Sequence, residues 1–156
     1  MADLLEDDRL FATCGERTGI GTSEVNALLF RNPSGSGRIV KPRLMVYNNT
    51  ATVNSFIRFR VYIDATVTAA GTGLTESALD IGSGNTAGAE VFTSPTTSAN
   101  GTIFLELSAP GNNASADQKV EFPDGFQLRE NHNLLVTAIS DGTNRTAHVC
   151  FFWEED

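Results

Sequence analysis

The sequence predicts a single all-β domain, a jelly-roll-like β-sandwich of about eight strands with an extended N-terminal arm. Three observations support this prediction. Gly, Ser, Thr and Asn together make up 54 of the 156 residues, which suits short strands joined by turns better than helices. Apolar residues recur at every second position over most of the chain, and turn signals separate the alternating segments. The length fits one domain with its own core.

The first 24 residues differ from those that follow. They are acidic, and their apolar residues show no two-residue alternation. We therefore interpret residues 1–24 as an arm, with room for one helical turn, and place the β-sandwich domain at residues 25–156. A frayed terminus is the alternative, whereas an ordered arm would be held by a neighbouring subunit.

Alternation begins at Val25 and predicts strands over residues 25–30, 38–47 and 53–67. The side chains expected to face the core are Val40, Leu44, Val46, Val53, Ile57, Phe59, Val61 and Ile63. Those expected on the opposite faces are Lys41, Arg43, Met45, Tyr47, Phe56, Arg58, Arg60 and Tyr62. Pro42 cannot donate a ladder hydrogen bond, so its strand is expected at a sheet edge or with a bulge.

The remaining strands are weaker in pattern. Residues 68–88 contain many glycines, and we interpret them as a loop with a short segment near residue 79. Further strands are predicted over residues 89–94, 101–109, 133–140 and 145–153, with a hairpin turn at residues 141–144.

The stretch Asn-Pro-Ser-Gly-Ser-Gly-Arg, residues 32–38, has two glycines, as phosphate-binding loops do. It lacks the Gly-Lys pair of a P-loop, and Val40 stands where a dinucleotide-binding loop has its third glycine. A strand is predicted to follow, so no helix N-terminus would face a phosphate. We interpret the stretch as a connection between strands.

No residues form a recognisable reactive centre. His132 and His148 are suited to proton transfer near neutral pH, but Cys150, two positions from His148 on one strand face, is too far for a nucleophile and its base. Three acidic residues could accept calcium but match no EF-hand loop: Asp117, Glu121 and Asp124. Paired carboxylates from distant strands stay open. We predict no enzyme activity, no catalytic residue, no cofactor and no bound metal.

Cys14 and Cys150 lie near opposite ends of the sequence. The sequence shows no secretory signal and no apolar run long enough to span a bilayer. We therefore expect synthesis in a host cytoplasm, no membrane partner, and two free thiols rather than a disulfide.

The net charge of −8 argues against nucleic acid as a partner. Six of the eleven Lys and Arg residues nevertheless lie within residues 31–60, which contain no Asp or Glu. If residues 38–47 and 53–62 pair through a turn at residues 48–51, they form one cationic and aromatic face. Its partner would be an acidic protein surface, or the acidic arm or tail of a neighbouring subunit. Single-stranded nucleic acid ranks second, and an ordinary solvated face is the alternative.

The order of four stretches resembles a known class of protein. The stretches are LLFRNPSGSGRIVKPRLMVYNN, LTESALDIGSGNTAGAEVFTS, FPDGFQLRENHNLLVTAISDGTN and FFWEED. Behind an acidic arm, this layout resembles the small β-sandwich virion proteins of tailed bacteriophages, especially the capsid decoration (cement) proteins. The resemblance rests on layout and on no catalytic motif.

The resemblance implies a homotrimer on the outer surface of the virion, where it binds the major capsid protein, stabilises capsomer junctions and catalyses nothing. It also implies that terminal segments reach neighbouring subunits. The matching residues are Leu4, Leu5, Leu10, Phe11, Phe151, Phe152 and Trp153. With the cationic and aromatic residues Lys41, Arg43, Tyr47, Phe56, Arg58, Arg60 and Tyr62, they form the predicted interface.

Other functions stay open. A head or tail fibre component would share the fold. A carbohydrate-binding or receptor-binding module of a phage fibre would present exposed aromatic side chains, and the candidates are Tyr47, Phe56, Tyr62 and Trp153. A trimeric ligand of the tumour necrosis factor type would need secretion, and an enzyme ranks last.

Overall fold

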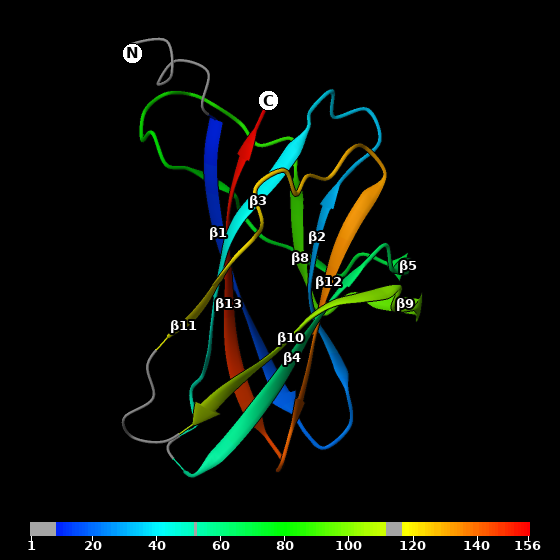
Figure 1. Ribbon diagram of the computed structural model, residues 1–156, viewed down its shortest axis with the longest axis vertical. Helices are drawn as coiled ribbons and strands as arrows, with labels where there is room; N and C mark the ends of the chain where they lie inside the picture. Colours follow the sequence, from blue (N-terminus) through cyan, green and yellow to red (C-terminus); the bar gives the residue numbers. More distant parts are fainter. Residues whose placement is uncertain (1–8, 52, 112–116) are drawn as a thin grey trace.

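The protein is a β-sandwich (Figure 1). This computed structural model describes residues 9–51, 53–111 and 117–156, a part of the chain that contains strands and no helix. The strands are β1 (Arg9–Ile20), β2 (Val25–Asn32), β3 (Val40–Asn49), β4 (Ser55–Ile63), β5 (Thr66–Ala69), β6 (Thr72–Gly73), β7 (Ser77–Ala78), β8 (Glu90–Thr93), β9 (Thr96–Ala99), β10 (Thr102–Gly111), β11 (Gln118–Glu121), β12 (His132–Ser140) and β13 (Arg145–Glu155).

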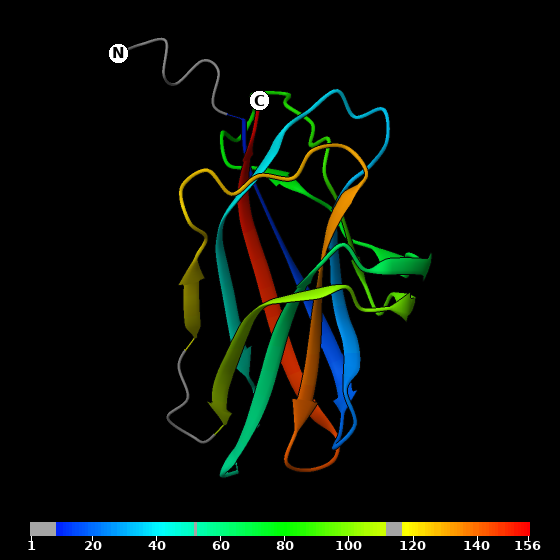
Figure 2. The same ribbon diagram turned by 45° about the vertical axis from the view of Figure 1, so that its right-hand side comes forward.

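Two antiparallel sheets face each other (Figure 2). Sheet A has the strand order β11-β3-β13-β1-β7, and sheet B has the order β10-β4-β12-β2-β8-β6. Strand β1 pairs with β13, β2 with β12, β3 with β11 and β4 with β10. This nested pairing, in which the first strand lies beside the last, is a jelly roll. It confirms the predicted β-sandwich, with thirteen strands in the described residues instead of about eight. Strands β5 and β9 form a separate ribbon that projects from the sandwich (Figure 2).

The predicted arm is part of the sandwich from Arg9 onward. Strand β1 lies between β13 and β7 in sheet A and pairs with β13 along almost its whole length. Its inward residues include Phe11, Thr13 and Gly15. Because two of these inward residues are a threonine and a glycine, the pattern of apolar residues does not reveal the alternation. The boundary between arm and domain, expected after residue 24, was therefore wrong, because the domain already includes Arg9.

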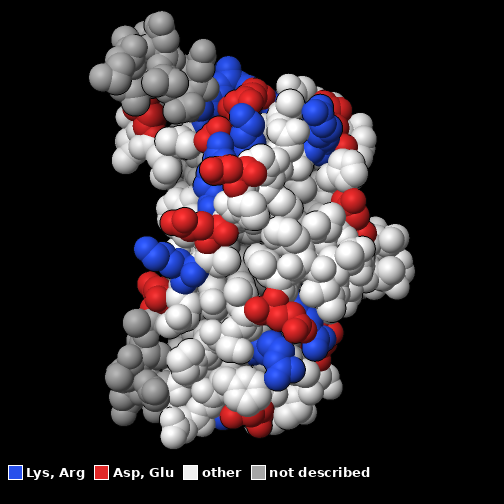
Figure 3. Space-filling model, in the orientation of Figure 1, with Lys and Arg blue, Asp and Glu red and all other residues white. Residues whose placement is uncertain are grey.

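The two segments expected to pair through residues 48–51 lie in different sheets. Strand β3 belongs to sheet A and β4 to sheet B, where β4 pairs with β10 and β12. The predicted cationic and aromatic face is therefore not one surface. In the view of Figure 3, Lys and Arg side chains lie beside Asp and Glu in most of the charged groups.

A bulge in β3 changes which of its residues face the core. The register against β13 shifts between Pro42 and Leu44. Beyond the shift, Met45 and Tyr47 are buried and Val46 faces outward, the reverse of the expected phase. A bulge accommodates a residue that has no N–H to donate. The bulge expected at Pro42 is thus confirmed, whereas β3 itself lies between β11 and β13.

Aromatic side chains from both sheets fill the centre of the sandwich. Trp153 stacks on Phe11 with ring centroids 5.8 Å apart and meets Phe30 edge-on at 5.0 Å. Phe30 also stacks on Phe151 at 5.0 Å. Each such ring pair contributes about 0.5–1.5 kcal/mol beyond its burial. Phe11, Phe151 and Trp153, which were expected at a subunit interface, instead hold the two sheets together.

A buried carboxylate fastens the end of the last strand. Glu155 is fully buried and accepts hydrogen bonds from the N–H groups of Gly88 at 2.7 Å and Ala89 at 2.9 Å. The indole N–H of Trp153 donates to the same carboxylate at 2.9 Å. Three donors offset much of the cost of removing this charge from water. The tail residue thus ties the connection before β8 to β13 within one subunit.

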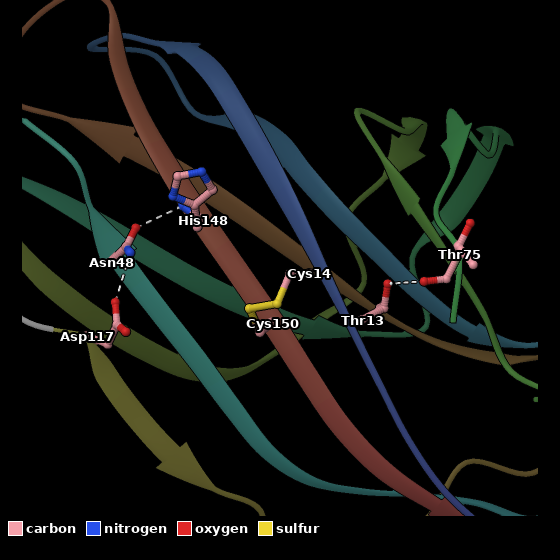
Figure 4. Close-up of a disulfide and its surroundings, with 7 residues drawn as sticks. All are labelled: Thr13, Cys14, Asn48, Thr75, Asp117, His148 and Cys150. Carbon is pink, nitrogen blue, oxygen red and sulfur yellow. Dashed lines mark hydrogen bonds between the residues drawn. A yellow bond between two sulfur atoms is a disulfide. The ribbon is translucent and has the colours of Figure 1, made fainter. Parts of the chain in front are cut away.

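Cys14 of β1 and Cys150 of β13 form a disulfide (Figure 4). The two residues are direct cross-strand partners with Cα atoms 4.0 Å apart. This finding corrects the expectation of two free thiols. The pairing of β1 with β13 brings the cysteines together, and their distance along the sequence gives no sign of it.

Candidate interaction surface

The outer face of sheet A carries apolar side chains between two polar borders. Six of them lie in two cross-strand rows: Val46, Cys150 and Cys14, then Leu44, Phe152 and Ala12. We call these six residues the sheet A stripe. All are exposed or partly exposed. The open face of an antiparallel sheet is usually polar, so an apolar stripe indicates a contact surface.

The stripe continues into an apolar corner made of Leu10, Leu79 and Ile81. Leu10 is 38% exposed, and its carbonyl oxygen accepts a hydrogen bond from the N–H of Leu79 at 2.8 Å. Leu79 is 48% exposed and Ile81 94% exposed. A hollow of about 530 Å³, lined by residues 77–85, lies at the same corner. Single exposed apolar residues are common, but adjoining ones mark a site of association.

An ion-pair cluster forms the border beside Leu10. Arg43 donates to the carboxylate of Glu154 through Nε at 2.9 Å and through Nη2 at 2.8 Å, and Lys41 Nζ lies 3.5 Å away. Lys41 also contacts Asp156. The acidic tail expected to reach a neighbouring subunit therefore binds cations of its own chain.

The cluster shifts the pKa values of its members. The hydrogen bond from Arg43 lowers the pKa of Glu154, because it stabilises the ionised carboxylate more than partial burial disfavours it. The hydrogen bond to Asp156 likewise raises the pKa of Lys41. The cluster therefore stabilises the fold at pH values between the lowered pKa of Glu154 and the raised pKa of Lys41.

We expect Glu154→Gln to lower the free energy of unfolding by about 1 kcal/mol at neutral pH. The lowered pKa of Glu154 contributes stability above the ordinary carboxyl pKa, and this contribution is lost as the pH falls through the lowered value. Urea unfolding at a series of pH values should show the two proteins converging in acid. Glu121→Gln, an exposed residue on β11, is the control and should change little. A difference between Glu154→Gln and wild type that stays constant with pH would contradict the ion-pair account.

Polar groups close the other end of the stripe. His148 Nε2 lies 2.9 Å from a carboxylate oxygen of Glu16, its direct cross-strand neighbour. The side chain of Asn48 accepts a hydrogen bond from the N–H of His148 at 3.1 Å and donates one to Asp117 at 2.9 Å (Figure 4). An apolar centre with a polar rim is the usual anatomy of a protein–protein interface.

The predicted interface residues lie in three separate places. Those on the outer face of sheet A are Leu10, Lys41, Arg43 and Phe152. Those on the outer face of sheet B are Phe56, Arg58 and Arg60. Tyr62 also lies on that side of sheet B, where it is buried in a small cluster with Ala65 and Leu135. Those in the core between the sheets, at most 6% exposed, are Phe11, Tyr47, Phe151 and Trp153. Leu4 and Leu5 lie outside the described residues.

The aromatic platform expected of a carbohydrate-binding module is not formed. Of its four candidate residues only Phe56 is exposed, at 41%, and the guanidinium of Arg58 lies 5.9 Å from its ring centroid. Tyr62 instead donates a hydrogen bond to Glu24 at 2.8 Å. Of the four candidates, the outer face of sheet B thus exposes one aromatic ring, Phe56, beside an arginine.

The residues that make this surface apolar were not predicted from the sequence. Leu44 and Val46 were expected inside, but they face outward because the bulge at Pro42 inverts the phase of β3. Leu79 and Ile81 fell within a stretch interpreted as a glycine-rich loop. The presence of these two large aliphatic residues in a polar stretch could have indicated an exposed apolar patch. They are not part of an alternating pattern, so they were not selected.

The residues considered for chemistry are not brought together. His132 begins β12 in sheet B, His148 lies in β13 in sheet A, and Cys150 is in the disulfide. No group of three or more His, Cys, Asp or Glu within the described ranges is placed to hold a metal ion. No helix suited to crossing a membrane is present in these ranges.

The glycine-rich stretch at residues 32–38 is a turn whose backbone N–H groups bind the carboxylate of Glu130. Gly35 and Gly37 have φ angles of 81° and 67°, which glycine adopts without steric cost. Their N–H groups donate to Glu130 at 3.1 Å and 2.8 Å. The amides that a phosphate-binding loop would direct at its ligand are therefore used within the protein.

No protein-family model matches the chain, and no curated protein shows significant sequence similarity to it.

Proposed function

We propose that this protein is a structural subunit of a bacteriophage particle, a homotrimer that binds the outer capsid surface and stabilises the junctions between capsomers. The observation that carries the proposal is the apolar surface formed by the sheet A stripe and the apolar corner. Burial of such a surface yields about 25 cal/mol per Å², a gain realised only when another protein covers it.

Two further features support this role. Jelly rolls are frequent among capsid proteins, although this support is by analogy of fold alone. A disulfide persists in oxidising surroundings, including the surface of a virus particle outside its host. A protein that serves outside the cell benefits from a covalent link between its first and last strands.

We expect the wild-type protein to sediment at three times the chain mass of 16.7 kDa. Phe152→Asp places a charge in the centre of the stripe and should raise the trimer dissociation constant at least about tenfold. Phe56→Asp is the matched control, because it makes the same change at an exposed residue of the other sheet. Analytical ultracentrifugation over a range of concentrations measures both.

Binding to a capsid is tested by co-sedimentation with phage heads that lack a decoration protein. Ile81→Asp should reduce the bound fraction, since it alters the most exposed apolar residue of the corner. A monomeric wild type would contradict the trimer. A trimer that does not bind heads would contradict the capsid role and leave self-association in place.

A further inference from the structure

A second hollow lies at one end of sheet B and is lined by both polar and apolar side chains. It has a volume of about 430 Å³ and lies between the end of β2, the start of β5 and the start of β12. His132, Asn131, Ser34 and Arg31 are among its lining residues. We call it the His132 pocket. Nothing in the proposed structural role uses it.

The imidazole of His132 is held in a fixed orientation. Its Nδ1 lies 2.9 Å and 3.0 Å from the two carboxylate oxygens of Asp64. The N–H of Asn133 donates to the same carboxylate at 3.3 Å, which helps to position it. With Nδ1 engaged, Nε2 makes no hydrogen bond to any described residue. A fixed ring with one nitrogen available to a ligand is a common arrangement in binding sites.

Asn131 presents a second available polar group. Its N–H is bonded to the carbonyl oxygen of Asn32 at 2.8 Å, whereas its side-chain amide has no partner among the described residues. Both Asn131 and Asp64 adopt left-handed φ angles, 68° and 58°. Non-glycine residues in this conformation are uncommon and concentrate at functional sites. Asn131 precedes His132 in the sequence, and Asp64 is the hydrogen-bond partner of its ring.

The charged groups around the pocket already have hydrogen-bond partners. Glu90 accepts hydrogen bonds from Arg31 at 2.8 Å, and the Arg31 guanidinium lies 4.7 Å from the ring centroid of Phe92. Asp64 is occupied by His132. A site whose charged groups already have hydrogen-bond partners offers little to an ionic ligand but can exchange hydrogen bonds with a neutral one. Pro33, Ala65 and Val67 add an apolar wall.

We infer that the His132 pocket binds a neutral saccharide unit. Sugar hydroxyls both donate and accept hydrogen bonds, which matches an imidazole nitrogen, a primary amide and the hydroxyl of Ser34. The C–H groups of a sugar ring would lie against the apolar wall. Pockets of about 300–1,000 Å³ with a few fixed polar groups are typical small-ligand sites. This site differs from the aromatic platform considered from the sequence, and it does not depend on the trimer or on capsid binding.

The test uses the full-length, fluorescently labelled protein on an array of neutral and acidic glycans. We expect binding to neutral glycans, followed by titration with the best one. Asn131→Gly removes the side-chain amide while keeping a residue suited to the left-handed φ angle. It should weaken binding about tenfold, the loss expected for one hydrogen bond. His132→Ala should weaken binding at least as much.

His148→Ala is the matched control, because His148 is also paired with a carboxylate but lies on the outer face of sheet A. It should leave glycan binding unchanged. Nitrogen NMR of the imidazoles should show the glycan shifting Nε2 of His132 and neither nitrogen of His148. Absence of glycan binding, binding confined to acidic glycans, or equal binding by the folded Asn131→Gly variant would overturn the inference.

Discussion

Replacing Trp153 with alanine should lower the free energy of unfolding by about 3–5 kcal/mol, the range measured for large aromatic residues in cores. Trp153 is 1% exposed and contacts the rings of Phe11 and Phe30 from both sheets. Its indole N–H also satisfies the buried carboxylate of Glu155. The substitution therefore leaves a cavity and removes one of the donors to a buried charge.

Phe152→Ala is the control for this experiment. Phe152 is the next residue of β13, but its side chain lies on the outer face of sheet A and is only partly buried. We expect a loss of about 1 kcal/mol, in proportion to the smaller area buried. Urea unfolding of both variants measures the difference at a protein concentration where wild type is monomeric. Equal losses would contradict the assignment of Trp153 to the core and Phe152 to the surface.

Replacing Cys14 and Cys150 together with serine should cost about 2–5 kcal/mol, the usual range for removal of a native disulfide. The disulfide closes a loop between residues 136 positions apart, and a long loop greatly restricts the unfolded chain. Cys14 is exposed and Cys150 partly exposed, so serine at these positions adds no buried hydroxyl group. The variant should keep its fold, because β1 and β13 remain paired through backbone hydrogen bonds.

Wild-type protein treated with a reducing agent is the control for the double serine variant. Its unfolding midpoint should approach that of the double serine variant, while the variant itself should not respond to the reducing agent. Mass measurement of alkylated protein reports whether the thiols are released. A wild type whose reduction is verified and whose midpoint does not move would contradict a stabilising disulfide.

Much of the fold could be predicted from the sequence, because successive side chains of a strand lie on opposite faces. The strand predicted over residues 53–67 contains β4 (Ser55–Ile63), but Val53 is 50% exposed rather than in the core, and residues 66–67 belong to the separate strand β5. Alternation at residues 133–140 matches all but the first residue of β12. The turn at residues 141–144 lies between β12 and β13 as predicted. Such signals are local, since each depends on the spacing of neighbouring residues.

The candidate surface could not be predicted in the same way. Alternation does not say which strands pair, and β3 and β4 are consecutive in sequence yet lie in different sheets. A one-residue bulge at Pro42 exchanges the two faces of β3, which moves Leu44 and Val46 from the expected core to the surface.

By itself, the sequence determined that this chain forms strands, turns and one sandwich, because side-chain period and turn chemistry act over a few residues. Only the tertiary structure decided that Cys14 meets Cys150, that Glu155 is buried, and which apolar residues remain exposed. These outcomes depend on contacts between residues far apart in the chain. The physical reason is that strand register over such separations is set by packing of the whole sandwich.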